Sequence, residues 1–456
     1  MYESLLSLVD YAYGVVYGPP LLLLITGVGL YLTYMLGGLQ FRFLPYALKL
    51  AFGKNKEASN TAGDISHFQS LMTALAATVG TGNLAGIATG IALGGFGALF
   101  WMWVTALIGM AIKYAEAILA VTYRVQDARG QMSGGPMYFI ERGLGWKWLA
   151  SSFAFFGIFA AFGGGNMIQA NSVADVMYNV FAVDPFWTAL VMAAITGLTI
   201  LGGIKYIAYV ASFLVPFMGC VYIGGSLFVL ATYAERIPDA FYLIVSSAFS
   251  GQAAVGGFLG AGVARAMQVG VSRGLMTSEA GLGTASIAAA AAKTDTPGKQ
   301  ALVSMTGSFL ATIIMCTMTG LVLAVTGVLG QVDAAGKIVN GASMTVLAFS
   351  SATSWGGYIV SLSLILFAFT TIVGWAYYGE KCVEYLFGEK SIPYFRIVFT
   401  LVCFTGALLE LQLVWKVSDI FNGLMALPNL IGLCALSPIV IRETRSFIAK
   451  LKAEPA

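Results

Sequence analysis

Within the apolar segment from residue 65 to residue 95 lies the stretch Ala76-Ala77-Thr78-Val79-Gly80-Thr81-Gly82-Asn83. A glycine inside a helix costs about 1 kcal/mol relative to alanine, and here two glycines stand within three residues. We therefore predict that this helix breaks at Gly80–Asn83. Helix packing alone is the alternative, and it is the better interpretation of the glycines that follow at every fourth position up to Gly94.

The composition around this stretch is that of a membrane protein. Of the 456 residues, 58% are hydrophobic and only 10% are charged, whereas soluble proteins carry about 25% charged residues. Apolar segments of about 20 residues recur along the chain, as membrane-spanning helices require. We predict an all-α integral membrane protein of about eleven transmembrane helices. The expected spans are 17–38, 65–95, 96–123, 148–180, 185–203, 206–232, 239–262, 299–329, 356–388, 393–410 and 416–441.

The distribution of positive charge predicts the orientation. With these spans, twenty of the 24 Lys and Arg residues lie on one side, three on the other, and Lys113 within a span. Cytoplasmic loops carry the excess of Lys and Arg, so we expect the N-terminus outside and the C-terminus in the cytoplasm. The five cysteines form no CxxC pair, which argues against disulfides and zinc. The net charge of +3 gives no reason to expect a nucleic acid partner.

A second weak point is expected in the seventh span, at Phe249-Ser250-Gly251-Gln252-Ala253-Ala254-Val255-Gly256-Gly257. Two interrupted helices at matching positions of two five-helix halves indicate a transporter with inverted repeats. We therefore divide the chain into four parts. They are an extra N-terminal helix with a cytoplasmic amphipathic segment (1–64), the first repeat (65–232), the second, inverted repeat (233–441) and a cytoplasmic tail (442–456).

An unwound stretch of helix frees backbone groups that can bind a zwitterion and a cation together. The N–H groups of Gly80, Thr81 and Gly82 suit a carboxylate. The carbonyls of Ala76 and Val79 suit a hard cation such as sodium. The side chains of Thr78 and Asn83 offer further oxygens for substrate, or for a weaker second cation site.

Several longer stretches resemble the alanine or glycine:cation symporter family. They are Gly80-Thr81-Gly82-Asn83, Gly94-Gly95-Phe96-Gly97-Ala98-Leu99-Phe100-Trp101-Met102-Trp103-Val104, Gly134-Gly135-Pro136-Met137-Tyr138-Phe139-Ile140-Glu141, Ser272-Arg273-Gly274-Leu275 and Glu279-Ala280-Gly281-Leu282-Gly283. The resemblance covers most of the chain. It implies a LeuT-type fold of the APC superfamily and sodium-coupled uptake of alanine or glycine. The chain departs from the family pattern at Met276-Thr277-Ser278, which we assign to a cytoplasmic segment.

The LeuT-type pattern extends the candidate site to other spans. The fourth span would bring Gln169 and Asn171 to the substrate, although bridging between helices explains Gln169 equally well. The ninth span would bring Thr370 and Thr371 to the sodium ion, unless each hydroxyl binds only its own helix. The ammonium group would meet the freed carbonyls around Phe249–Gly251. The remaining candidates for substrate are Phe249, Ser250, Gln252 and Trp375, where packing is the alternative for both aromatic residues.

Titratable groups receive structural interpretations. Lys113 and Glu116 are one turn apart and are expected to pair with each other. His67 is expected as a solvated residue beside the capping box of Ser66 and Gln69. Glu279 is expected on the cytoplasmic side, either at an inner gate with Arg265 and Arg273 or on a solvated helix.

The resulting hypothesis is a sodium symporter for alanine or glycine, with D-alanine an open question, that works by alternating access as a monomer. We place it in the plasma membrane of a prokaryotic cell, with sodium as coupling ion and no cofactor. A proton-coupled carrier is the alternative, but it would need a titratable group at the breaks, and the two predicted breaks carry none. A channel would show uniform polar stripes. An enzyme or an ATP-driven pump is disfavoured, because no catalytic pair, HExxH motif or GxxxxGK[ST] loop occurs.

Overall fold

The chain folds almost entirely into helices in the computed structural model, which describes residues 2–16, 18–53, 61–250, 261–332, 336, 338–409 and 412–453. The helices are α1 Tyr2–Val16, α2 Pro19–Met35, α3 Leu39–Arg42, α4 Leu44–Phe52, α5 His67–Thr78, α6 Ala85–Gly94, α7 Gly97–Thr122, α8 Pro136–Leu144, α9 Lys147–Phe162, α10 Ile168–Phe181, α11 Pro185–Leu201, α12 Gly203–Thr232, α13 Ile237–Ser247, α14 Ala261–Ser278, α15 Thr284–Ala290, α16 Pro297–Ser308, α17 Thr317–Thr326, α18 Gly341–Ser350, α19 Gly356–Phe387, α20 Ile392–Leu408, α21 Gln412–Ala435 and α22 Ser437–Ala453. The single-turn 3-10 helices are η1 Thr81–Asn83, η3 Ala234–Arg236 and η5 Glu389–Ser391, and the π-helices are η2 Gly163–Met167 and η4 Phe309–Cys316. A short hairpin pairs β1 Val125–Gln126 with β2 Met132–Ser133.

The described residues contain eight helices that are long and apolar enough to cross a membrane. They are Ser7–Met35, Gly97–Thr122, Lys147–Phe181, Gly203–Thr232, Pro297–Thr326, Gly356–Phe387, Glu389–Leu408 and Val414–Ala435. The first begins ten residues earlier than the expected start at residue 17, because α1 continues the apolar run toward the N-terminus. Other expected spans consist of shorter helices, such as α5 with α6, and α11. The count of eleven therefore stays a prediction.

The first predicted break is confirmed. Helix α5 begins with a capping box, in which Ser66 and Gln69 each bind the other's backbone N–H. It ends at Thr78, and Gly80 is extended with φ −123°. A single turn, η1, then leads into α6. The glycine-rich sequence thus divides one span into two half-helices.

A second break is also present, but the structure shows it at Glu279–Gly283, whereas of the predicted stretch 249–257 only Phe249 and Ser250 are described. The discontinuous span is α14 followed by α15, and the chain between them turns at Glu279–Gly283. Three residues of that turn, Glu279, Gly281 and Gly283, have positive φ values of 51°, 90° and 81°. Glycine adopts this backbone region without strain, which explains why the helix stops here. Residues 251–260 lie outside the described part of the chain.

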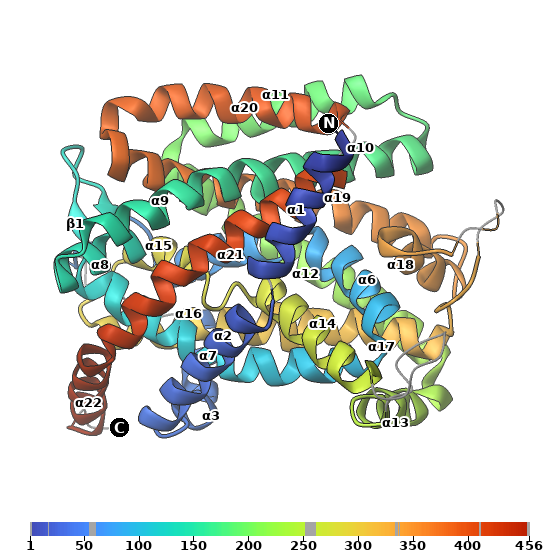
Figure 1. Cartoon of the computed structure of the whole chain (residues 1–456), viewed down its shortest axis with the longest axis horizontal. Coiled ribbons are helices and arrows are strands. Elements are labelled where there is room, and N and C mark those ends of the chain that lie inside the picture. Colours follow the sequence, from blue (N-terminus) through green and yellow to red (C-terminus); the bar gives the residue numbers. More distant parts are fainter. Residues whose placement is uncertain are drawn as a thin grey trace.

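The two broken helices run in opposite directions. Helix α5 packs against α15, and α6 packs against α14, so the first half of one span meets the second half of the other. Figure 1 shows α15 toward the end of the molecule that carries α22, and α14 toward the end that carries α13. This antiparallel arrangement is the one expected of inverted repeats. The two turns lie against each other at the centre of the molecule.

The corrected seventh span also moves two positive charges. Arg265 and Arg273 belong to α14, the half-helix on the side of α6 and α13. They therefore do not lie at the end that carries α22, although the predicted distribution of Lys and Arg residues had placed them on that side.

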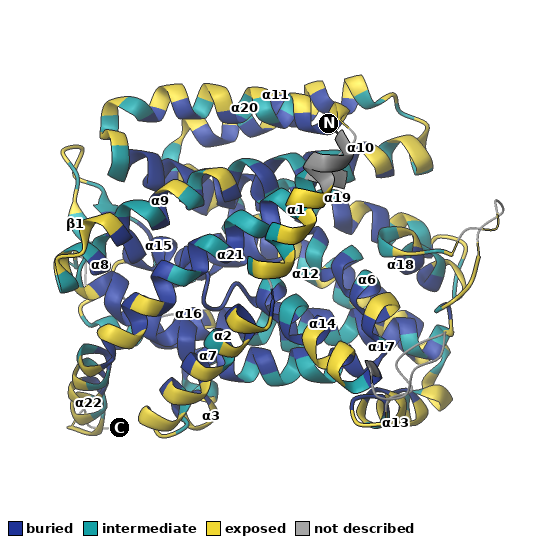
Figure 2. Cartoon of the chain, in the orientation of Figure 1, coloured by how far each residue is buried: buried dark blue, intermediate teal, exposed yellow. Residues whose placement is uncertain are grey.

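Most residues of the central helices are buried, whereas the outer faces of α11 and α20 expose many side chains (Figure 2). The predicted orientation across the membrane stays a prediction.

Candidate functional site

A cavity of about 80 Å³ lies between the two breaks. One water molecule needs about 10–15 Å³ of such space, so the cavity holds a solute of only a few heavy atoms. Helix α5 and η1 contribute Thr78, Gly80, Thr81 and Gly82, and the turn between α14 and α15 contributes Glu279. The predicted Gln169, Thr371 and Trp375 also line it. The structure therefore brings together residues from four separate parts of the chain.

The backbone of the first break faces this cavity. The N–H of Thr81 donates to Oε1 of Gln169 over 3.3 Å, and the N–H of Gly80 donates to Oδ1 of Asn83 over 3.2 Å. The side-chain amide of Gln169 is itself held by the carbonyl of Gly164, in the π-helix η2. These N–H groups are bound to side-chain oxygens, which a carboxylate oxygen can replace at the same donors. Asn83 also donates to the carbonyl of Ala311 over 3.1 Å.

Three oxygens predicted to bind a cation converge on one point. The hydroxyl of Thr371, on α19, lies 3.1 Å from the carbonyl oxygen of Ala76 and 3.4 Å from that of Val79. A hydroxyl carries only one hydrogen, so it can donate to only one of these carbonyls at a time. The neighbouring Thr370 points elsewhere, because its hydroxyl donates to Phe367 in its own helix over 3.0 Å. The set of Ala76, Val79 and Thr371 thus fits a sodium ion, and Thr370 does not join it.

The turn at Glu279–Gly283 is held from α7. Oε1 of Glu116 accepts the N–H groups of Gly281 and Gly283 over 3.0 and 3.1 Å, and the side-chain amide of Asn429 over 2.7 Å. The predicted partner Lys113 attracts Glu116 electrostatically, but no ion pair within 4.0 Å joins the two among the described residues. Glu116 instead supports the second break, which explains why a buried carboxylate is kept there.

Glu279 is the main residue that the sequence placed wrongly. It was expected at the cytoplasmic surface, but only 3% of it is exposed and its carboxylate lines the cavity. Its Oε2 accepts the hydroxyl of Thr284 over 3.0 Å, and the hydroxyl of Thr78 lies 3.1 Å from the same oxygen and 2.7 Å from the carbonyl oxygen of Ala74. The expectation that the breaks carry no titratable group is therefore wrong. His67, expected to be solvated, is buried against Gln300.

Helix α21 adds a wall that the sequence analysis missed. Trp415, Ser418, Asp419 and Asn422 line the cavity, and both Ser418 and Asp419 are buried. Their spacing of three and four residues places them on one face of a helix. A stripe of polar residues at this spacing, in an otherwise apolar span, is the sequence pattern that could have indicated this wall of the cavity.

Four predicted substrate residues within the described part of the chain do not line the cavity, and the first is Asn83, whose side chain instead binds Gly80 and Ala311. Phe249 is 60% exposed and packs against Phe100 and Trp101. Ser250 is exposed next to it, and Gln252 lies outside the described residues. Asn171 donates to the carbonyl of Leu409 and lines a second, larger cavity.

That second cavity, the vestibule, measures about 640 Å³ and lies between α10 and α18. Asp175 and Asn179 of α10 and Ser343 of α18 give it polar walls. Trp415 lines both the vestibule and the central cavity. Along α10, Gln169 faces the central cavity and Asn171 the vestibule, so the two spaces follow each other along one helix.

The comparisons with known proteins agree with this arrangement of broken helices. The profile of the sodium:alanine symporter family matches residues 2–456. The chain belongs to this family. The sodium/alanine symporter AgcS of Methanococcus maripaludis is 54% identical over 448 residues, which are 97% of each chain.

Two solved structures share the fold at low sequence identity. MhsT in complex with L-phenylalanine has a TM-score of 0.58 at 14% identity, over 84% of this chain and 98% of that chain. A Na+-coupled sialic acid symporter has a TM-score of 0.54 at 12% identity, over 88% of this chain and 86% of that chain. Both are LeuT-fold transporters, which confirms the predicted fold class. This family member is therefore a multi-pass membrane protein and a sodium-coupled amino-acid symporter, not an enzyme.

Proposed function

We propose that this symporter carries alanine or glycine together with sodium, by alternating access. The observation that carries the proposal is the central cavity of about 80 Å³ between the breaks. Its small volume suits a side chain no larger than a methyl group. The N–H groups of Thr81 and Gly82 suit the substrate carboxylate, and Trp375 with Leu282 limits the space for a longer side chain. The 54% identity to a sodium/alanine symporter supports alanine as substrate.

The sodium ion in this proposal binds at Ala76, Val79 and Thr371. Two carbonyls released by the end of α5 and one hydroxyl of α19 provide oxygens from two different helices. Unwound carbonyls of a broken helix are typical sodium ligands in carriers of this kind. An ion here would hold α5 and α19 together, and would thereby fix the first break in the shape that receives the substrate. Binding of sodium and of amino acid would then favour each other.

Alternating access is supported by the difference between the two ends of α19. Leu364, near the start of the helix, lines the open vestibule. Lys381, near its end, is fully buried and bound to Ser133 of the hairpin over 2.7 Å and to Glu384 over 2.8 Å. One end of the molecule is thus hollow and the other is closed.

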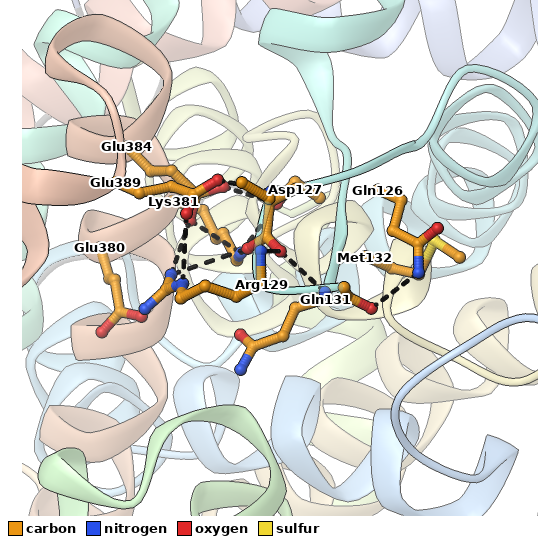
Figure 3. A network of polar contacts seen from close by, with 12 residues as sticks. Gln126, Asp127, Arg129, Gln131, Met132, Glu380, Lys381, Glu384 and Glu389 are labelled. Atoms are coloured by element: carbon orange, nitrogen blue, oxygen red, sulfur yellow. Dashed lines mark hydrogen bonds and ion pairs between the residues drawn. The ribbon is translucent and has the colours of Figure 1, made fainter.

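The closed end is held by an ionic network around the β1–β2 hairpin (Figure 3). Arg129 lies 3.6 Å from Asp127, 3.7 Å from Glu384 and 3.5 Å from Glu389, measured between charged atoms. The hairpin is also tied to the start of α5, because Asp64 accepts the N–H of Met132 over 2.7 Å. Burial raises the pKa of the Asp64 carboxyl. Opening this end would require these contacts to separate.

The change Arg129→Gln is expected to loosen the closed end. The Arg129 side chain is 38% exposed, so its pairs contribute only about 0.2–1 kcal/mol each. Hydrogen–deuterium exchange of residues 125–133 should become about fivefold faster, which corresponds to about 1 kcal/mol. Lys299→Gln removes the separate surface pair with Asp295 and is the matched control. Equal exchange in the wild-type protein and Arg129→Gln would argue against the hairpin as the closing element.

Uptake by proteoliposomes tests the proposed function directly. Labelled alanine and glycine should accumulate when sodium is high outside and low inside, and glutamine should compete poorly because its side chain exceeds the cavity. An imposed pH gradient without sodium should drive no accumulation. Accumulation driven by pH alone would instead support the proton-coupled alternative, with Glu279 or Asp419 as the group that carries the proton.

A further inference from the structure

Glu279 is a buried carboxylate that lines the cavity and has no cation in direct contact among the described residues. Within the described part of the chain, no nitrogen of Lys, Arg or His lies within 4.0 Å of its carboxylate oxygens. Lys113, fully buried on α7, attracts Glu279 electrostatically but does not contact it within 4.0 Å. Buried charges in proteins are normally paired by direct contact, and a cationic group in the cavity would supply that contact to Glu279.

The helices around Glu279 add to the negative potential at this side of the cavity. Helix α5 ends at Thr78, whose hydroxyl binds Glu279, and α14 ends at Ser278, directly before it. The carbonyl ends of helices carry partial negative charge. Thr81 and Gly82, whose N–H groups carry partial positive charge, line the same cavity. The cavity therefore offers both kinds of partner that a zwitterion requires.

The backbone holds Glu279 in an unusual conformation. Its φ of 51° falls in the left-handed region that a residue with a side chain rarely adopts. The conformation is fixed by the hydrogen bond from its N–H to the carbonyl of Leu275 over 2.8 Å. It is also fixed by the hydrogen bonds that Gly281 and Gly283 donate to Glu116. Such strain persists where the surrounding structure determines it, and it is concentrated at functional sites.

We propose that Glu279 accepts the ammonium group of the substrate and makes the symporter selective for α-amino acids over α-hydroxy acids. This inference rests on the proposed function, and it identifies the residue that recognises the amino group of the substrate. Thr284 positions the carboxylate by donating to Oε2, and the hydroxyl of Thr78 lies 3.1 Å from the same oxygen. Asp419, the other acidic residue that lines the cavity, lies on α21 and interacts electrostatically with Arg273 of α14. We assign it no contact with the ammonium group.

The test compares L-alanine with L-lactate, which has a hydroxyl in place of the ammonium group. Both compete against labelled alanine for the purified full-length protein in sodium. The wild-type protein should prefer alanine strongly. In Glu279→Gln, alanine affinity should fall by about 30-fold or more, because bonds between two charged groups are the strongest in proteins. Lactate affinity should stay within about threefold, since the amide can still bind a neutral hydroxyl.

Asp419→Asn is the matched control and should leave the ratio of alanine to lactate affinity unchanged. An equal loss for both ligands in Glu279→Gln would show that Glu279 only supports the break, and would overturn the proposal. A collapse of the ratio in Asp419→Asn alone would move the role to Asp419. If Glu279→Gln does not fold, Glu279→Asp decides the matter, because a shortened carboxylate should weaken alanine and not lactate. Failure of the wild-type protein to bind alanine would reject the proposed function itself.

Discussion

Replacing Thr371 with valine is expected to weaken sodium binding by about 10- to 100-fold, since a bond to a charged partner contributes about 1.5–3 kcal/mol. Valine keeps the shape of threonine and removes only the hydroxyl oxygen. That oxygen is the one that approaches the carbonyls of both Ala76 and Val79. Alanine binding at fixed sodium should fall in parallel and recover when sodium is raised. Sodium titration of alanine binding measures both effects.

Thr370→Val is the matched control, because it makes the same change at the next position of α19. Thr370 is equally buried, but its hydroxyl binds Phe367 and lies near the sulfur of Met218. Its replacement should leave sodium affinity within about twofold, as expected for loss of a bond within one helix. Equal sodium affinities in Thr371→Val and the wild-type protein would rule out the proposed sodium ligands.

Gly80→Ala is expected to abolish transport while the protein still folds. A Cβ at this position would stand 2.6 Å from Oγ1 of Thr371 and 3.2 Å from Oε1 of Gln169. Threonine is branched at Cβ and has little freedom to move away. The methyl group would therefore displace a sodium ligand and the partner of the Thr81 N–H together. Removing both should lower alanine binding by at least about 100-fold, as about 3 kcal/mol is lost.

Gly86→Ala provides the comparison for that change. Gly86 lies in α6, one turn beyond the break, and a Cβ there would meet nothing within 4 Å. Alanine also favours the helix over glycine by about 1 kcal/mol, so this variant should be at least as stable and as active as the wild-type protein. Transport by Gly80→Ala at the wild-type rate would contradict the account of the first break.

The first break, and the cluster of Ala76 and Val79 that we propose as sodium ligands, could be predicted because their determinants are local. Two glycines with a threonine and an asparagine inside an apolar segment disfavour a continuous helix through Gly80–Asn83. Once that break is placed in the middle of the membrane, the carbonyls of Ala76 and Val79 become candidate ligands, because these residues directly precede the break in the sequence. The choice of Thr371 over Thr370 did not follow, because neighbouring residues on a helix differ in direction by about 100° and only packing fixes which one faces inward.

The second break was misplaced because two features of the sequence misled the prediction of the span. The apolar helix α13 follows α12 closely and was taken for the start of the seventh span. Arg265 and Arg273 were taken for cytoplasmic charges, although both lie in the half-helix α14. The sequence Glu279-Ala280-Gly281-Leu282-Gly283 therefore seemed to follow the membrane instead of lying at its centre. With that error, Glu279 could not be recognised as a residue of the cavity.

The most direct test of the central claim is the binding of L-alanine to the purified protein, in sodium and in an equal concentration of potassium. Coupling through Ala76, Val79 and Thr371 predicts tight binding in sodium and little or none in potassium, with sodium affinity increased by alanine in return. Binding that is equal in both salts and changes only with pH would contradict the account. It would show that protonation of the cavity carboxylates, and not a sodium ion at the first break, controls the site.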